Sequence, residues 1–292
     1  MYKKGLVSII IPSFNGEKFI TQTIDNCINQ DYKNIEIIVI DDGSTDNTKQ
    51  ILTPYIDKNL INYIYQSNKG LPGARNTGLN VATGEFVQFL DADDLLDKNK
   101  IFSQVMYLNN NPNIFGVYCK SKYFKNSINE IFQVLDIHYD DNMYKKLLDV
   151  NFFTVHSILI RNTEFRFDET LKSLEDWDFW LTLTYNNKLI NYIDESCCYV
   201  RVHGNNMCKN SKRMLTNELN VLNKNLNRGK FLDIINFNIF KRKYLLNETD
   251  AKNFYKLAVN ENKKFIIEKY KFITKHKLKI ILKKSNSIYE DK

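Results

Sequence analysis

With 292 residues, 43% of them hydrophobic and 13% aromatic, the chain can bury one large core, or one core with a smaller appendage, which excludes a disordered protein. Its five cysteines include no Cys-x-x-Cys pair, so neither a disulfide framework nor a zinc site is indicated, and no apolar stretch approaches the ~20 residues of a membrane span. The net charge of +7 is uneven, because residues 1–209 carry −5 and residues 210–292 carry +12.

Apolar and β-branched runs alternate with segments of helical spacing over the first 97 residues. The predicted strands are Leu6–Ile11, which Pro12 should stop, Ile35–Ile40, Ile61–Tyr65 and Glu85–Leu90. The predicted helices are Glu17–Gln30, Thr45–Tyr55, and one that follows the loop Gln66–Arg75 and ends near Gly84. This alternation predicts an α/β fold with a doubly wound, mostly parallel, Rossmann-like sheet and helices on both faces.

Polar residues follow three of these strands where each one ends. They are Pro12-Ser13-Phe14-Asn15, Asp41-Asp42 and Asp91-Ala92-Asp93. Ligands of such sheets lie beyond the carboxyl ends of the strands, so we expect all three to face one crevice. Crowded carboxylates form either a solvated loop tip or a divalent metal site, and their convergence favours the metal. The chain has no G-x-G-x-x-G after the first strand and no Walker sequence, so a cation would have to neutralise a bound phosphate.

Three segments carry a resemblance to a known family: VSIIIPSFNGEKFI, IIVIDDGSTDNT and NKGLPGARNTGLNVATGEFVQFLDADD. They resemble the successive signatures of the family 2 inverting glycosyltransferases with the GT-A fold, closely over residues 5–97 and more loosely to about residue 208. The resemblance implies a catalytic domain at 1–208, with a nucleotide-binding half at 1–97 and an acceptor half at 98–208. A basic helical region would follow at 209–292.

The activity implied by the resemblance is sugar transfer by a single in-line displacement. The expected donor is a nucleotide diphosphate sugar, with UDP as the expected nucleotide, and the expected cofactor is Mn²⁺ or Mg²⁺. The acceptor would be a hydroxyl of a glycan or lipid-linked glycan of the bacterial surface, such as lipooligosaccharide or capsule. Two other classes stay open. A nucleotidyltransferase uses a similar sheet but normally has a Gly-rich basic loop where this chain has PSFNGEKF, and a non-catalytic binding protein could keep the same fold.

The resemblance assigns the nucleotide to the ends of the first two strands. Phe14 would flank the base and Asp42 would hydrogen-bond it, with Asp41 beside it. The alternative for these two carboxylates is a strand-to-helix turn in which Ser44 or Asp46 caps the next helix. Other residues expected at the nucleotide sugar are Pro12, Asn15 and Ala92.

The Asp-x-Asp motif of the family matches Asp91 and Asp93. By this match Asp91 would contact ribose and Asp93 would bind the metal, whereas Asp94 is expected to cap the next helix. Arg75 would position the acidic motif or the diphosphate. A solvated helical arginine is the alternative for Arg75.

The segment Ser173–Trp180, SLEDWDFW, predicts a helix with acidic residues in its first turn, where carboxylates complement the helix dipole. It also resembles the Glu-Asp motif of the family, which makes Asp176 the general base and Glu175 its support. Trp177 and Trp180 could offer a sugar-stacking face, although tryptophans at this spacing also pack in cores.

The segment Tyr199–His203 predicts a strand that ends in a histidine. The resemblance makes His203 a second metal ligand beside Asp93, and Arg201 a weaker candidate for diphosphate contact. His156 could line the acceptor pocket or be a satisfied core histidine.

The C-terminal region carries 20 Lys and Arg against 8 Asp and Glu. A basic amphipathic helix can lie on an anionic membrane or pack on the catalytic domain with a solvated lysine face, and both alternatives stay open. We therefore expect a cytoplasmic protein, peripheral on the inner face of the membrane under the first alternative. Nucleic acid is not an expected partner, because no binding module is recognisable. The apolar face is Ile266, Tyr270, Ile273 and Ile280, and the lysines around it are Lys263, Lys264, Lys269, Lys271, Lys275 and Lys279.

Overall fold

The structure is a computed structural model that describes residues 2–139, 142–204 and 211–276. The chain forms two compact units, Met1–Lys209 and Asn210–Lys292, and the break lies beside the boundary expected at residue 208. Across the described ranges, the helices are too short or too polar to cross a membrane.

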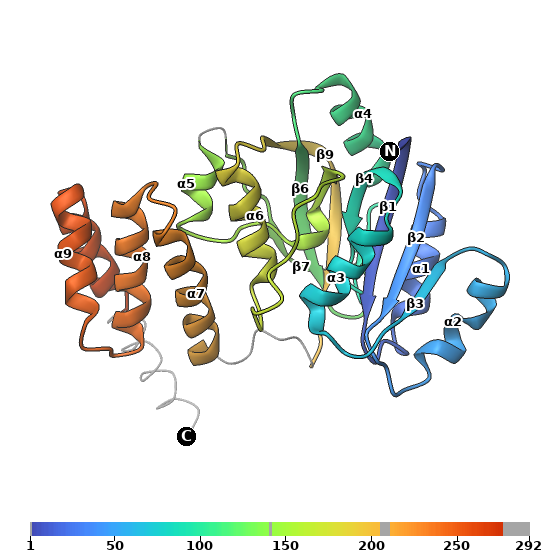
Figure 1. Cartoon of the computed structure of the whole chain (residues 1–292), viewed down its shortest axis with the longest axis horizontal. Coiled ribbons are helices and arrows are strands. Elements are labelled where there is room, and N and C mark those ends of the chain that lie inside the picture. Colours follow the sequence, from blue (N-terminus) through green and yellow to red (C-terminus); the bar gives the residue numbers. More distant parts are fainter. Residues whose placement is uncertain (1, 140–141, 205–210, 277–292) are drawn as a thin grey trace. The chain divides into compact units, whose positions relative to one another are not determined.

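The first unit is built on one mixed sheet in the order β3-β2-β1-β4-β8-β6-β9-β5, with β7 paired to β6 (Figure 1). The first four strands of the chain are parallel, as their alternation with helices predicted. The later strands add antiparallel pairs, except that β6 and β9 are parallel. The bounds are β1 Lys3–Ser13, β2 Ile35–Asp41, β3 Asn62–Tyr65, β4 Gly84–Phe89, β5 Leu95–Leu96, β6 Gly116–Phe124, β7 Ile131–Leu135, β8 Ile158–Arg161 and β9 Ile190–Arg201.

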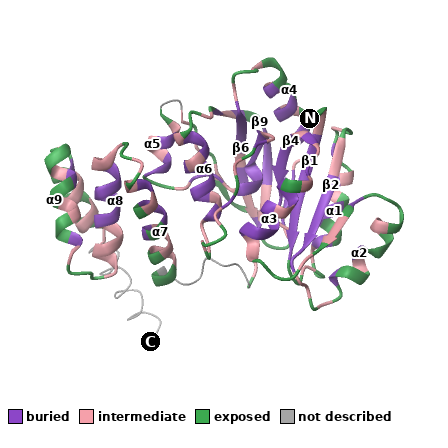
Figure 2. Ribbon diagram, in the orientation of Figure 1, coloured by how far each residue is buried: buried purple, intermediate pink, exposed green. Residues whose placement is uncertain are grey.

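Helices cover both faces of this sheet. The core on one face joins alternate residues of β1 with apolar side chains of α1, α2 and α4. On the other face α3 lies so close that a Cβ atom on Gly78 would stand 2.3 Å from Cγ2 of Ile10. Figure 2 shows the resulting buried strands between the helices. The helices are α1 Ile20–Ile28, α2 Thr48–Asp57, α3 Gly70–Val81, α4 Lys100–Asn110, α5 Met143–Leu147, the 3₁₀ turn Val155–Ser157 and α6 Glu175–Tyr185.

Several predicted boundaries are wrong: α1 begins at Ile20 rather than Glu17, α2 begins at Thr48 rather than Thr45, and β9 ends at Arg201, two residues before His203. Two further errors have a clear physical reason. Pro12 does not stop the first strand, which continues to Ser13. β4 pairs with β1 only as far as Ile10, so the missing N–H of Pro12 removes no hydrogen bond from that ladder. Helix α3 begins at Gly70, inside the segment expected to be a loop. Pro72 then falls in the first turn, where an amide N–H has no partner within the helix.

The second unit is helical, as predicted. Residues 265–276 form a further helix after α9, and Phe265 stacks on Phe237 of α8 with ring centroids 4.4 Å apart. Ile266, Ile267 and Tyr270 remain exposed on that helix, at 41%, 62% and 67%. Lys279 and Ile280, which the predicted amphipathic face included, lie outside the described residues. The other helices of this unit are α7 Ser211–Leu226, α8 Leu232–Leu245 and α9 Ala251–Glu261.

Candidate active site

The parallel strands β1, β2 and β4 end at the same edge of the sheet. At that edge the Asp42 N–H donates to the Ser13 carbonyl (2.8 Å) and the Leu90 N–H to the Ile10 carbonyl (3.0 Å). The segments that follow the three strands are therefore neighbours, as the predicted crevice requires.

Asp41 and Asp42 are both buried, but their carboxylates have different hydrogen-bond partners. Asp41 accepts from the Ser44 N–H (2.8 Å) and the Tyr63 hydroxyl (2.6 Å), so it supports the turn after β2. Burial, and then this bond to Asp41, raise the pKa of Tyr63. Asp42 accepts from Gln66 and from the Lys69 N–H at Oδ1. Within the described residues its Oδ2 accepts no hydrogen bond, which leaves that oxygen for a ligand.

The residues after β1 have different surroundings. Phe14 is 55% exposed, so its ring is available to flank a base, whereas Pro12 is buried within the strand. Asn15 adopts a φ of 52°, and its Oδ1 accepts from the Thr45 N–H (2.8 Å), so this side chain ties two loops together. The start of α2 is held by Asp46, whose Oδ1 accepts from the Thr48 N–H (3.0 Å).

Arg75 joins the two halves of the predicted site. Its guanidinium donates to Asp91 (2.8 Å) and to Glu175 (2.6 Å), although these two carboxylates are 84 residues apart in sequence. Arg75 and Glu175 are buried, and Asp91 is one-third exposed. Burial alone would lower the pKa of Arg75, but Asp91 and Glu175 outweigh it and the pKa is raised. The Arg75–Asp91 contact agrees with a positioning role; the Arg75–Glu175 contact had no signal in the sequence.

Helix α6 begins at Glu175, where the acidic first turn predicted it. Leu174 precedes it with a left-handed φ of 63°, a costly conformation for a branched side chain. Asp176 is half-buried, and its carboxylate accepts hydrogen bonds from the backbone N–H of Trp177 (2.7 Å) and from the side chain of Asn151 (3.3 Å). Burial, and then the adjacent Glu175, raise the pKa of Asp176 to about 6. A carboxylate with this pKa can accept a proton near neutral pH.

Asp93 and His203 are brought together from distant parts of the unit. Asp93 Oδ2 lies 2.7 Å from His203 Nε2, and both side chains remain partly exposed. A carboxylate oxygen is the ligand type that Mn²⁺ and Mg²⁺ prefer, and imidazole is a common ligand of divalent transition metals. The pair therefore fits the metal site that the resemblance implied.

Arg201, the last residue of β9, binds the backbone of Asp93. Its Nε donates to the Asp93 carbonyl (2.8 Å) and its Nη2 to Gln22 (2.6 Å), with the guanidinium between the rings of Phe19 and Phe124. The residue is 4% exposed. A buried and bonded guanidinium does not suit the diphosphate contact suggested for Arg201; it holds the backbone of Asp93.

The prediction that Asp94 caps the next helix is wrong. Helix α4 begins only at Lys100, after strand β5, and Asp94 instead accepts from the Arg201 N–H (2.6 Å). Burial, and then Asp93 and Asp91, raise the pKa of Asp94 well above its ordinary value. His156 is also buried, with Nδ1 3.3 Å from Asp94 Oδ2.

Asp91, Asp94 and His156 form a second group that could hold a metal, each with one ligand atom within 4.8 Å of the others. His156 is a core histidine whose partners are Asp94, 3.3 Å from its Nδ1, and the buried Cys198. Sequence reasoning missed this group, because His156 enters from a 3₁₀ turn that matches no motif.

The tryptophans of α6 do not form a sugar-stacking face. Trp177 and Trp180 are 1% and 0% exposed, and Trp177 donates its indole N–H to the Leu147 carbonyl (2.7 Å). Both pack in the core, so that alternative is wrong.

The sequence profile described as glycosyl transferase family 2 matches residues 8–166, more than half of the chain. The chain belongs to glycosyltransferase family 2. The carboxylates at the strand ends, Arg75 and part of the acceptor half all lie within the match. Family membership favours glycosyl transfer over the nucleotidyltransferase alternative.

Relatives carry glycosyltransferase names. An uncharacterized glycosyltransferase of Rickettsia typhi is 38% identical over 188 residues, which are 60% of this chain and 57% of that protein, so the chain spans little more than half of that relative. An uncharacterized glycosyltransferase of Haemophilus influenzae is 32% identical over 209 residues, which are 68% of this chain and 79% of that protein. Escherichia coli WfaP, named a UDP-Glc:α-D-GlcNAc-diphosphoundecaprenol β-1,3-glucosyltransferase, is 31% identical over 74% of this chain and 85% of its own.

Solved structures show the same GT-A fold. Staphylococcus aureus TarS in complex with UDP-GlcNAc aligns with a TM-score of 0.63 and 22% identity over 82% of this chain and 72% of its own. The Pyrobaculum calidifontis mannosyltransferase PcManGT, solved with GDP-Man and Mn²⁺, aligns with a TM-score of 0.59 and 20% identity over 76% and 64%.

Proposed function

We propose that this glycosyltransferase moves a sugar from a UDP-linked donor to a hydroxyl of a bacterial surface glycan or its lipid-linked precursor, with inversion at the anomeric carbon. The observation that carries the proposal is the buried Arg75, bonded to Asp91 of the donor motif and to Glu175 beside Asp176. This contact supports the assignment of the donor motif and the proposed base to one site. UDP is proposed because TarS was solved in complex with UDP-GlcNAc. A lipid-linked acceptor is proposed because WfaP is named for a diphosphoundecaprenol-linked one.

Each residue then has a chemical task. Phe14 and Asp42 bind the nucleotide base. Asp176 accepts the proton of the acceptor hydroxyl while the acceptor oxygen forms a bond to the anomeric carbon. The bond from that carbon to the diphosphate breaks on the opposite face. Glu175, held by Arg75, keeps the base in place.

Mn²⁺ or Mg²⁺ held by Asp93 and His203 would neutralise negative charge on the departing diphosphate. We favour this pair over Asp91, Asp94 and His156. Asp91 is already paired with Arg75, and Asp94 with the Arg201 N–H, whereas Asp93 and His203 bond one another at a partly exposed position.

The test of the function is a UDP-release assay over a panel of UDP-sugars, with and without Mn²⁺ or Mg²⁺, in which slow hydrolysis replaces the unknown acceptor. We expect metal-dependent release from one sugar. If the protein binds UDP with metal but never releases it, with or without bacterial glycan acceptors, it is a non-catalytic binding protein.

The metal assignment predicts how two variants differ. Asp93→Asn should weaken Mn²⁺ binding in the presence of UDP at least about tenfold, because even outer-shell changes cost that much. His156→Gln should leave it nearly unchanged. Isothermal titration calorimetry on both folded variants measures this, and the reverse order would move the metal to the Asp91, Asp94 and His156 group.

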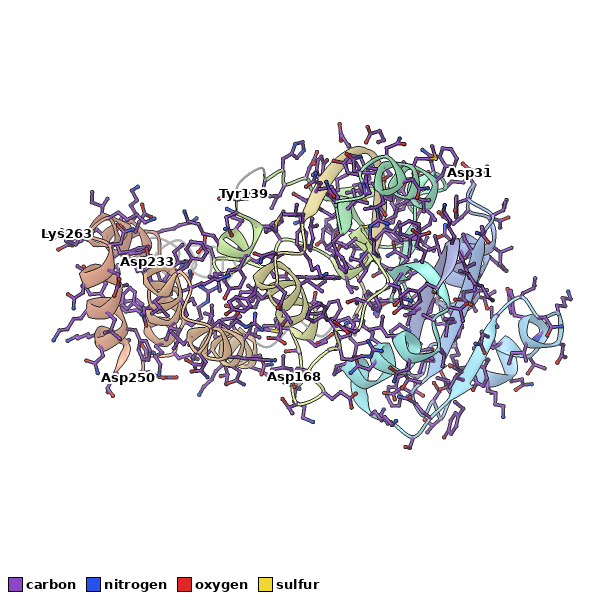
Figure 3. The ribbon with its side chains drawn as sticks, turned by 45° about the horizontal axis from the view of Figure 1, so that its top comes forward. Asp31, Tyr139, Asp168, Asp233, Asp250 and Lys263 are labelled. Carbon is purple, nitrogen blue, oxygen red and sulfur yellow. The ribbon has the colours of Figure 1, made fainter. Side chains whose placement is uncertain are left out.

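We also propose that the second unit contacts an anionic membrane. The exposed Ile266, Ile267 and Tyr270 share the helix 265–276 with exposed lysines, among them Lys275, and Lys263, labelled in Figure 3, lies just before it. Apolar insertion and about 1 kcal/mol per nearby cation would act together.

The double variant Ile267→Glu/Tyr270→Glu should therefore reduce flotation with phosphatidylglycerol vesicles at least about tenfold. The matched control, Ile128→Glu/Phe132→Glu, changes exposed apolar residues of the first unit and should bind as the unchanged protein does. Equal binding by all three would remove the membrane contact from the proposal.

A further inference from the structure

A cavity of about 510 Å³ opens in the first unit where α6 ends and β9 begins. Its lining includes Thr184 near the end of α6 and Tyr192 near the start of β9. Tyr139, labelled in Figure 3, comes from the segment before α5 and lines it too. None of these residues belongs to the site described above.

The cavity lies far from the proposed metal pair. Strand β9 begins opposite Gly116 of β6 and ends opposite Phe124, two residues before His203. Eight steps along β6 at about 3.3 Å each separate the two ends by roughly 26 Å. A molecule in the cavity would therefore not occupy the donor crevice.

Aromatic side chains form much of the wall. His138 stacks on Tyr192 with ring centroids 3.9 Å apart, and the Tyr192 hydroxyl donates to Asp136 (2.5 Å), which fixes the ring. Tyr107 and Tyr139 add further aromatic surface. Such faces pack against the C–H groups of a sugar ring.

Uncharged amides complete the lining. Asn191 donates through Nδ2 to the Tyr107 hydroxyl (2.9 Å), and its Oδ1 accepts no hydrogen bond from the described residues. The side-chain amide of Asn187 likewise makes no hydrogen bond within the described part of the chain. An amide offers both a donor and an acceptor, which matches the hydroxyl groups of a saccharide.

The described residues that line the cavity carry mostly uncharged polar groups. They are hydroxyls, amides and one imidazole, with Asp136 bonded behind Tyr192. The one lysine among these described residues, Lys188, lies over the Phe115 ring, 5.1 Å from the centroid, so they do not form the cluster of cations that a phosphate site needs. Rigid aromatic faces with unused amides and little charge are typical of a site for a neutral polar molecule.

We propose that this cavity is a second saccharide site, which binds a neutral sugar unit of the glycan away from the donor crevice. The choice of a glycan as its source rests on the proposed function. The binding chemistry itself follows from the lining residues.

Saturation-transfer NMR of the full chain tests this with the methyl glycosides of glucose, galactose, mannose and N-acetylglucosamine, in the presence of saturating UDP and Mn²⁺. We expect at least one glycoside to bind. The double variant His138→Ala/Asn187→Gly should weaken that binding about tenfold, through a lost ring and a lost hydrogen bond. Glycine suits position 187, where φ is 58°, and His138 is exposed, so the variant should fold.

The matched control is Asn186→Ala. Asn186 is exposed, donates to the Thr182 carbonyl (2.8 Å) and does not line the cavity, so its loss should leave glycoside binding unchanged. Absence of binding by any glycoside, or equal binding by the double variant, would overturn the second site. UDP binding in the same samples separates this outcome from failure of the proposed function, which would remove UDP binding as well.

Discussion

Replacement of Asp176 by Asn is expected to reduce kcat at least about 1,000-fold, within the range usually lost with a general base. The amide cannot accept the acceptor's proton, yet it keeps the size of the carboxylate and the contact with the Trp177 N–H. UDP affinity should change little, because Asp176 does not belong to the nucleotide side of the site. Transfer kinetics and calorimetry of UDP binding measure the two effects separately.

The pH profile sharpens this prediction. Because burial and Glu175 raise the pKa of Asp176 to about 6, the carboxyl is protonated and inactive below that pH, so kcat/KM should rise with pH through a midpoint near 6. The variant should lose this rise. Asp149→Asn, a change at an exposed carboxylate of the same unit, is the control. An equal loss of UDP binding and of transfer in Asp176→Asn would show a structural role instead.

Replacement of Arg75 by Met should lower the free energy of unfolding by about 3–5 kcal/mol, the cost of leaving buried carboxylates without their partner. Most of this loss in unfolding free energy should come from the buried Glu175, because Asp91 is one-third exposed and water can solvate it. The pKa of Asp176 should also rise, because Arg75 lowers it at present. Urea denaturation measures the stability, and residual transfer should show its pH midpoint moved upward.

Arg166→Met provides the comparison. Arg166 bonds Asn80 and main-chain carbonyls, such as that of Thr163, at an exposed position, so its loss should cost about 1 kcal/mol or less. Similar losses in both variants would mean that the buried bridge contributes nothing special. A stable Arg75→Met protein with an unmoved pH midpoint would separate Arg75 from the base altogether.

The sequence predicted the parallel half of the sheet and the strand-end carboxylates because these features repeat locally. Ile35–Ile40 is almost purely apolar, and Asp41 and Asp42 follow it at once. The errors at Pro12 and Gly70 arose where tertiary pairing decides whether a missing N–H or a flexible residue matters.

The contacts that assemble the site could not be predicted in this way. Arg75 and Glu175 are 100 residues apart, and Asp94 and His156 are 62 apart. Neither pair has a spacing that any helix or strand would produce. The antiparallel strands decide these contacts, and their order in the sheet follows no local pattern.

Strand β5 has a consequence for synthesis of the chain on the ribosome. Leu95–Leu96 pairs with β9, which begins only at Ile190, and Asp93 lies just before it. When the first 97 residues have emerged, the acidic turn therefore has neither its strand partner nor His203. Because synthesis adds about 5–20 residues per second, more than five seconds must pass before β5 can pair with β9 and Asp93 can contact His203. The nascent donor half is expected to need protection from aggregation during this interval.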